Sequence, residues 1–178
     1  MSRPAKPATG VYFWPGDYAP LWKRFLVDIA DMAVAGIAWL VVFLFALPSL
    51  DLALAICAVL GFLYFVPLKR SRFRTLGYRL GGVRIVGLDG RPPGYFALTM
   101  RLVFALLGPL NWLMDLMFLS GDPHRQALRD KFAQTYVVRK DAEAAGQGKL
   151  VYRYYEILVY NFLFREVEIP KADSQAVG

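Results

Sequence analysis

Residues 22–70 read WKRFLVDIADMAVAGIAWLVVFLFALPSLDLALAICAVLGFLYFVPLKR, and this stretch decides the fold. Residues 32–50 and 52–68 contain no charged side chain, and an apolar run of about 18 residues or more is long enough to cross a bilayer as a helix. Pro48 and Ser49 interrupt the run just before Asp51, which predicts a tight turn. We therefore expect a transmembrane helical hairpin, with helices at 22–47 and 50–68.

The overall composition supports a membrane protein. Of 178 residues, 57% are hydrophobic and 20% are charged, whereas soluble domains average about 45–50% and about 25%. The net charge is +7, and seven basic residues and one acidic residue lie between positions 67 and 97. Because Lys and Arg favour the cytoplasmic side, we expect both outer ends of the hairpin and the N-terminus to be cytoplasmic.

The basic segment that follows the hairpin predicts a lipid contact. Its cations sit directly beside a membrane helix, so we expect them to bind anionic lipid headgroups and expect no nucleic acid. The candidate headgroup contacts are Lys69, Arg70, Arg72, Arg74 and Arg79.

Several functional classes have no support in the residue inventory. The chain has one cysteine, Cys57, and one histidine, His124, so an internal disulfide or a Cys/His zinc site cannot be built within one chain. No phosphate-binding loop, nucleophile-elbow or HExxH motif is present. We expect no enzymatic activity, no cofactor and no metal.

Two short segments have the composition of β-strands. Residues 82–87 alternate as strands do and are followed by a turn signal at 88–91. Pro92 and Pro93 block a regular return strand, whereas 135–139 has strand composition. We predict that 82–87, in the basic loop (69–97), pairs with 135–139 and forms a small cytoplasmic β element.

A third hydrophobic segment, 98–119, allows two interpretations. Gly108-Pro109 lies in its middle, and proline breaks or kinks a helix. The segment is either a broken, re-entrant hairpin with both ends in the cytoplasm or a single kinked transmembrane helix. In the broken form, Arg101 and Asp115 lie one on each arm, close enough to pair.

The ends of the chain complete the expected architecture, an all-α membrane protein apart from the small β-pairing. We expect a flexible arm at 1–17, a membrane domain at 18–140, a linker at 141–148 and disorder at 170–178. Polar residues recur at roughly helical spacing in 149–169, which predicts an amphipathic helix lying on the membrane or against a partner. A homo-oligomer or a membrane-protein partner would contact this helix.

Three charged residues share one face of the first helix. At about 100° per residue, Asp28 and Asp31 lie about +40° and −20° from Arg24. A charged residue at mid-helix depth costs about 2.5–3.5 kcal/mol, so Asp31 should face the protein interior. Two readings remain open: a structural anchor, or an ion or substrate site in which one aspartate has a raised pKa.

These residues resemble the RDD family of bacterial membrane proteins over about 18–140. The family's opening pattern is similar to Lys23-Arg24 followed by Asp31, with Asp28 as an additional acid. Its later patterns are similar to Thr75-Leu76-Gly77-Tyr78-Arg79-Leu80, Gly82-Val83-Arg84-Ile85-Val86, Asp89-Gly90-Arg91-Pro92, Arg101, Arg125-Gln126-Ala127-Leu128-Arg129-Asp130-Lys131 and Thr135-Tyr136-Val137-Val138-Arg139. Two features depart from the family: Arg129 stands where a histidine is usual, and the Tyr/Phe-rich tail is additional.

The resemblance implies a multi-pass protein of the bacterial cytoplasmic (inner) membrane with a proposed role in transport of a cation, a proton or a small solute. Two or three spans are few for a transporter, so transport would need an oligomer. The alternative is a non-transporting accessory or scaffold subunit that binds anionic lipid and a membrane partner. The resemblance makes Arg24, Asp31 and Asp130 the signature site, joined by Asp28. Arg101, Asp115, Arg125, Thr75 and Gly77 are its supporting residues.

Overall fold

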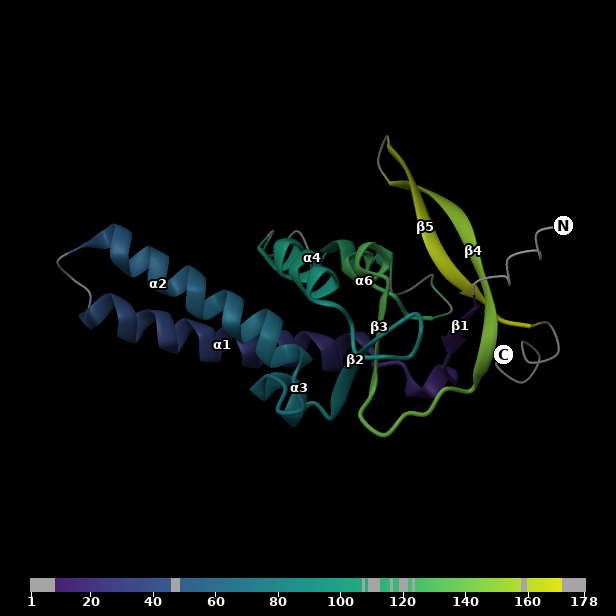
Figure 1. Cartoon of the computed structure of the whole chain (residues 1–178), viewed down its shortest axis with the longest axis horizontal. Coiled ribbons are helices and arrows are strands. Elements are labelled where there is room, and N and C mark those ends of the chain that lie inside the picture. The colour runs from purple at the N-terminus through teal and green to yellow at the C-terminus, as the bar shows by residue number, and fades with distance from the viewer. Residues whose placement is uncertain are drawn as a thin grey trace, which may run out of the picture.

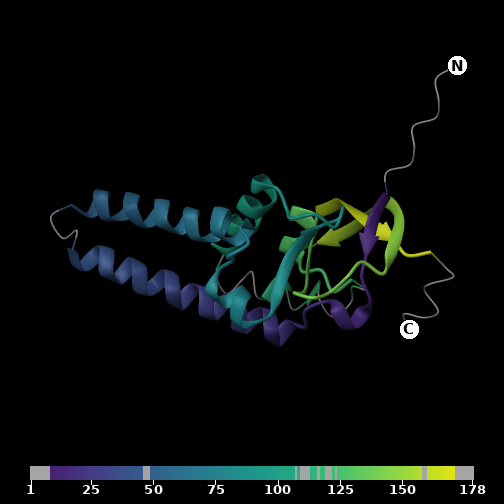
Figure 2. The ribbon, with the colours of Figure 1, turned by 60° about the horizontal axis from the view of Figure 1, so that its bottom comes forward.

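The computed structural model describes residues 9–45, 49–106, 108, 113–115, 117–118, 122, 124–157 and 160–170. A long helical hairpin projects from one side of a mixed body of short helices and two sheets (Figures 1 and 2). The hairpin is formed by α1 (Leu21–Phe45), α2 (Leu50–Leu63) and a π-helical turn, η2 (Tyr64–Leu68). These elements occupy the segments predicted as the two membrane helices.

The hairpin exposes most of its apolar side chains. Within the described part of the chain, two helices, Leu21–Phe45 and Leu50–Leu68, are long and apolar enough to cross a membrane. Ser49 caps α2 by accepting a hydrogen bond from the Leu52 amide at 3.4 Å. Pro67 lies inside η2, and its missing N–H is consistent with the local widening to a π-helical turn.

A two-stranded ladder lies at the base of the hairpin. Strand β2 (Val83–Gly87) pairs antiparallel with β3 (Thr135–Arg139), with Ile85 opposite Val137. This is the pairing that alternation predicts. The buried core around it includes Val83 and Val137 together with Ala19, Val27, Val66, Tyr78, Ile85 and Leu98.

The expectation of an all-α protein with a helical tail is wrong. The tail forms β4 (Gly146–Ile157) and β5 (Tyr160–Glu168), and β1 (Thr9–Tyr12) completes a three-stranded sheet in the order β1-β4-β5. Val151 and Tyr155 are half-buried, whereas Tyr152 and Tyr154 are exposed. The antiparallel register, with Lys149 opposite Glu168 and Glu156 opposite Asn161, identifies this segment as a strand. Aromatic residues favour strands, and the spacing of polar residues that suggested a helix is shared between two strands.

The boundaries of the terminal segments also differ from expectation. The arm predicted to be flexible forms β1 and a 3-10 turn, η1 (Pro15–Asp17), and the predicted linker contributes its last residues to β4. Residues 1–8 and 171–178 of the two predicted mobile ends lie outside the described residues.

Three short helices surround the β2-β3 ladder: α3 (Leu76–Leu80), α4 (Tyr95–Ala105) and α6 (Leu128–Ala133). Helix α4 packs against α6 and ends before Gly108, which has a left-handed φ of +59°. The predicted break in 98–119 therefore coincides with the end of α4. Pro109 and most of the second expected half-helix lie outside the described ranges.

Candidate functional site

Asp31 is held by the last turn of the hairpin and by the segment that follows it. Its carboxylate accepts hydrogen bonds from the Gly77 amide at 2.7 Å, the Thr75 hydroxyl at 2.6 Å and the Tyr64 hydroxyl at 3.0 Å. A Cβ on Gly77 would lie 2.2 Å from the Val27 carbonyl oxygen, so only glycine allows this approach. Thr75 and Gly77 therefore do support the signature aspartate, through its hydrogen bonds.

Asp130 lies at the centre of a second set of contacts. Its carboxylate forms ion pairs with Arg24 and Arg101 and accepts a hydrogen bond from the Ala127 amide at 3.1 Å. Burial by itself would raise the pKa of Asp130, but the two guanidinium groups outweigh burial and hold that pKa below its ordinary value. Asp130 is thus a permanent anion that joins α1, α4 and α6.

Arg24 donates to backbone carbonyls in addition to its ion pair with Asp130. Its Nε donates to the Ala19 carbonyl at 2.9 Å, and an Nη donates to the Arg125 carbonyl at 2.7 Å. The Arg125 side chain is exposed and its φ is +46°. Arg125, one of the predicted supporting residues, therefore contributes its backbone carbonyl.

Asp28 and Asp115 share one partner, Arg129. The Arg129 guanidinium lies 2.6 Å from Asp28 and 3.0 Å from Asp115. Burial would lower the pKa of Arg129, but these carboxylates raise it above its ordinary value. Burial raises the pKa of Asp115 to about 6, despite Arg129. One Asp115 oxygen, Oδ1, has no hydrogen-bond donor among the described residues.

The pairing inside this cluster differs from the sequence expectation. Asp28 and Asp31 lie on the same helix face but bind different groups, and the expected pair of Arg101 with Asp115 is replaced by Arg101 with Asp130 and Arg129 with Asp115. Arg129, noted in the sequence only as a departure from the family, was missed as a site residue. We call these eight side chains the charged cluster: Arg24, Asp28, Asp31, Lys69, Arg101, Asp115, Arg129 and Asp130.

The five predicted headgroup contacts differ in their exposure to solvent. Arg70, Arg72 and Arg79 are exposed, and the Arg70 guanidinium lies 4.5 Å from the centre of the Tyr95 ring. Arg74 is half-buried and donates to the Val83 carbonyl at 3.1 Å. Lys69 turns inward, with one-tenth of its side chain exposed.

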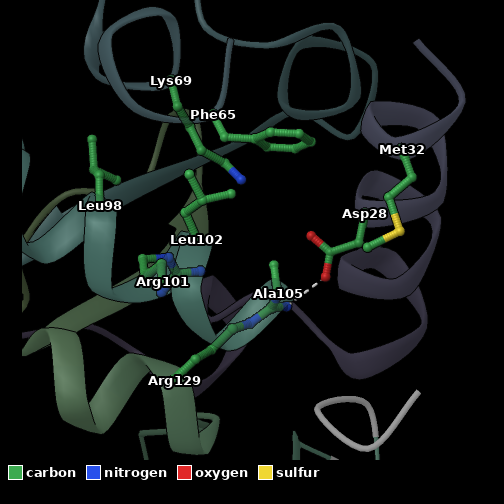
Figure 3. Close-up of a pocket in the computed structure, with 9 residues that line it drawn as sticks. All are labelled: Asp28, Met32, Phe65, Lys69, Leu98, Arg101, Leu102, Ala105 and Arg129. Atoms are coloured by element: carbon green, nitrogen blue, oxygen red, sulfur yellow. Dashed lines mark hydrogen bonds and ion pairs between the residues drawn. The ribbon is translucent and has the colours of Figure 1, made fainter. Parts of the chain in front are cut away.

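Two adjoining cavities lie beside the charged cluster. One, of about 20 Å³, is lined by Asp28, Lys69, Arg101 and Arg129 among apolar side chains (Figure 3). The other, of about 650 Å³, is lined almost entirely by apolar side chains of α1, α2 and α4. Among the residues placed by the structure, no group of three or more His, Cys, Asp or Glu side chains could hold a metal ion.

A second buried charge set fastens the tail and has no counterpart in the sequence analysis. Lys131 pairs with Asp122 and, at 2.5 Å, with Glu166 of β5. The Nδ1 atom of His124 is hydrogen-bonded to the Tyr18 hydroxyl at 2.9 Å, and its Nε2 atom lies 3.0 Å from the Val167 carbonyl oxygen. Asp122, His124 and Lys131 lie close together in the chain, but Tyr18, Glu166 and Val167 are far from them, so no local spacing reveals the set.

The comparisons with known proteins identify one family. The model of the RDD family matches residues 18–134, which include α1, α2, strand β2 and the whole charged cluster. No curated protein matches the chain, and no solved structure does. Because the match covers well over half of the chain, this protein belongs to the RDD family.

Proposed function

We propose that this chain is a non-transporting accessory protein of the bacterial inner membrane, in which the charged cluster locks a transmembrane hairpin to a cytoplasmic α/β body. Its membership of a membrane-associated family and its two apolar helices support the membrane location. The basic segment at 67–97 supports cytoplasmic placement of the body and of the N-terminus.

The observation that carries the proposal is how the signature carboxylates are used. Asp31 accepts three hydrogen bonds from this chain, and Asp130 is held by two arginines and a backbone amide. A carboxylate that serves a moving ion must exchange its partners. The partners of these two carboxylates instead come from α1, η2, α4 and the first turns of α3 and α6, and they connect the hairpin to the body. Four cations and four carboxylates make the formal charge of the cluster zero.

The proposal is tested by reconstitution. Vesicles that contain the purified protein and trapped indicators of pH, sodium and potassium should show no flux of these three cations above protein-free vesicles. The Asp31→Asn and Asp130→Asn variants should instead lose stability, because each leaves buried donors without an acceptor. Flux that disappears in either folded variant would contradict the proposal.

A proton-linked role is the second candidate, and Asp115 favours it. Its pKa of about 6 and its unpartnered Oδ1 allow it to change protonation close to neutral pH. In this case the wild-type vesicles would carry a proton flux that Asp115→Asn abolishes and Asp141→Asn, an exposed control, leaves unchanged.

A further inference from the structure

Lys69 is a partly buried cation, and its ion pair with Asp31 is a long one. Its side chain is one-tenth exposed, and the nearest carboxylate oxygen, on Asp31, is 4.0 Å away. Lys69 has no hydrogen-bond acceptor among the residues that the structure describes; its other contacts are the rings of Tyr78 at 4.4 Å and Phe65 at 5.5 Å. Buried ammonium groups are normally paired with an anion.

The Lys69 ammonium points into the smaller cavity, which Arg101 also lines (Figure 3). The Nε of Arg101 is also buried without an acceptor among the described residues. Asp28, the carboxylate on this cavity, is 2.6 Å from Arg129 and thus already paired. The cavity therefore offers donors to an incoming anion, and its 20 Å³ suit one oxygen-sized group.

The same cavity adjoins the apolar one. Met32, Phe65, Leu102 and Ala105 line both. From these shared residues the apolar cavity follows α1 and α2 into the hairpin, past Trp39 and Cys57. Its volume of about 650 Å³ lies within the range of about 300–1,000 Å³ that is usual for small-molecule sites.

We propose that the two cavities form one binding site for an anionic phospholipid, with a phosphate oxygen beside Lys69 and one acyl chain in the apolar cavity between α1, α2 and α4. The argument is one of complementarity: a cationic end joined to a long apolar space matches an anion joined to a hydrocarbon chain. The exposed Arg70 and Arg72 lie on the segment just after Lys69, where the rest of a headgroup would emerge. The inference rests on the proposed membrane setting and does not depend on whether the protein transports.

Native mass spectrometry of the full chain in detergent tests the site. Phosphatidylglycerol should remain bound, whereas phosphatidylcholine with the same acyl chains should bind at least about tenfold more weakly. Lys69→Gln should weaken phosphatidylglycerol binding about tenfold, since a charge-assisted contact is lost. Arg79→Gln, which removes one exposed cation from the same segment, is the matched control and should change binding less than about twofold.

A second pair of variants tests the acyl-chain cavity. Ala105→Phe should fill the space between the two cavities and weaken binding of both lipids, whereas Val103→Phe, on an exposed part of α4 that lines neither cavity, should not. If Ala105→Phe does not fold, Ala58→Phe tests the same cavity from an exposed position on α2. Inorganic phosphate in excess should not displace the lipid.

Three results would overturn this inference. Equal losses in Lys69→Gln and Arg79→Gln would indicate diffuse surface attraction. Unchanged lipid affinity in a folded Ala105→Phe or Ala58→Phe variant, with or without a change in oligomeric state, would show that no acyl chain occupies the apolar cavity. Displacement by inorganic phosphate would reduce the site to a phosphate site. Ion flux in vesicles would contradict the proposed accessory role and would leave the lipid site unaffected.

Discussion

Two aspartates of the charged cluster, Asp31 and Asp130, are held by different kinds of interaction. Asp31 depends on a close approach of backbone, because the Gly77 amide donates to it at 2.7 Å. Asp130 depends on charge, because two arginines surround it without leaving it exposed to water. A substitution that adds bulk near Asp31 should therefore disrupt its contacts, whereas a substitution that changes charge should disrupt the contacts of Asp130.

Gly77→Ala is expected to destabilise the protein by about 1–3 kcal/mol, the usual cost of overpacking. The new methyl group would lie 2.2 Å from the Val27 carbonyl and 2.7 Å from the Asp31 carboxylate. Unfolding in mixed micelles measures the loss. Gly36→Ala is the control, because nothing lies within 4 Å of its Cβ and helical Gly→Ala changes are favourable by about 0.5–1 kcal/mol. Equal stability of the two variants would contradict the close packing.

His124 predicts a loss of stability in mild acid. Burial lowers its pKa below the ordinary value of about 6.5, so below pH 6.5 the unfolded chain binds the proton before the folded chain does. Stability from His124 is complete above about pH 6.5 and falls as the pH decreases toward the folded pKa. Asp115 acts in the opposite sense: its raised pKa gives stability that is lost as the pH rises through about 6.

The comparison of wild type with His124→Gln separates these two effects, because Asp115 is common to both. The unfolding free energy of the variant, measured from pH 7.5 to 5.5, should fall less steeply than that of the wild type. Parallel curves would show that His124 does not titrate in this range.

At the scale of elements, the tail hairpin is fastened to the body by a buried lysine. Lys131 contacts Asp122 and Glu166, and the Phe132 ring packs against Phe162 and Phe164 of β5. The ion pair and the aromatic packing therefore both hold strand β5 against α6. The other face of the hairpin exposes Tyr152, Tyr154 and Leu163.

Lys131→Met should release β4 and β5 while leaving the transmembrane hairpin folded. It removes the lysine from Asp122 and leaves Glu166 with the more distant Arg153, and the loss of one partner from a buried ion pair costs about 3–5 kcal/mol. Hydrogen exchange should become faster in 146–168 and stay unchanged in α1. Arg153→Gln provides the control, because Arg153 lies 3.6 Å from the same Glu166 but is 56% exposed and should cost at most about 1 kcal/mol. Unchanged exchange in Lys131→Met would show that aromatic packing alone holds the tail.

The elements also show what the sequence can and cannot predict. The apolar runs specify α1 and α2 because spanning a bilayer requires length and composition alone, and alternation specifies β2 and β3. The tail was mistaken for a helix because 149–169 carries polar residues at spacings that fit both periods, and pairing across two strands decides between them. The positions of Arg24, Asp31 and Asp130 were recognisable, but the choice of Asp130 over Asp115 by Arg101 depends on tertiary packing.

At the scale of the whole molecule, the proposed topology places the turn at Ser49 outside and the body inside. Labelling of two single-cysteine variants tests it, since Cys57 is the sole cysteine and can be replaced by alanine. In right-side-out vesicles, a membrane-impermeant maleimide should label Ser49→Cys at once. Asp141→Cys, at a position 71% exposed, should react only after permeabilisation. The reverse pattern would invert the topology.

The central claim is that the charged cluster joins the hairpin to the body, and a double-mutant cycle on Arg101 and Asp130 tests it most directly. We expect Asp130→Asn alone to lower the unfolding free energy in mixed micelles by about 3–5 kcal/mol, because two buried arginines lose their carboxylate. Arg101→Met combined with Asp130→Asn should be less destabilised than the sum of the single variants by about 1–3 kcal/mol. Additive losses, or a stable Asp130→Asn variant that has lost an ion flux present in the wild type, would contradict the account.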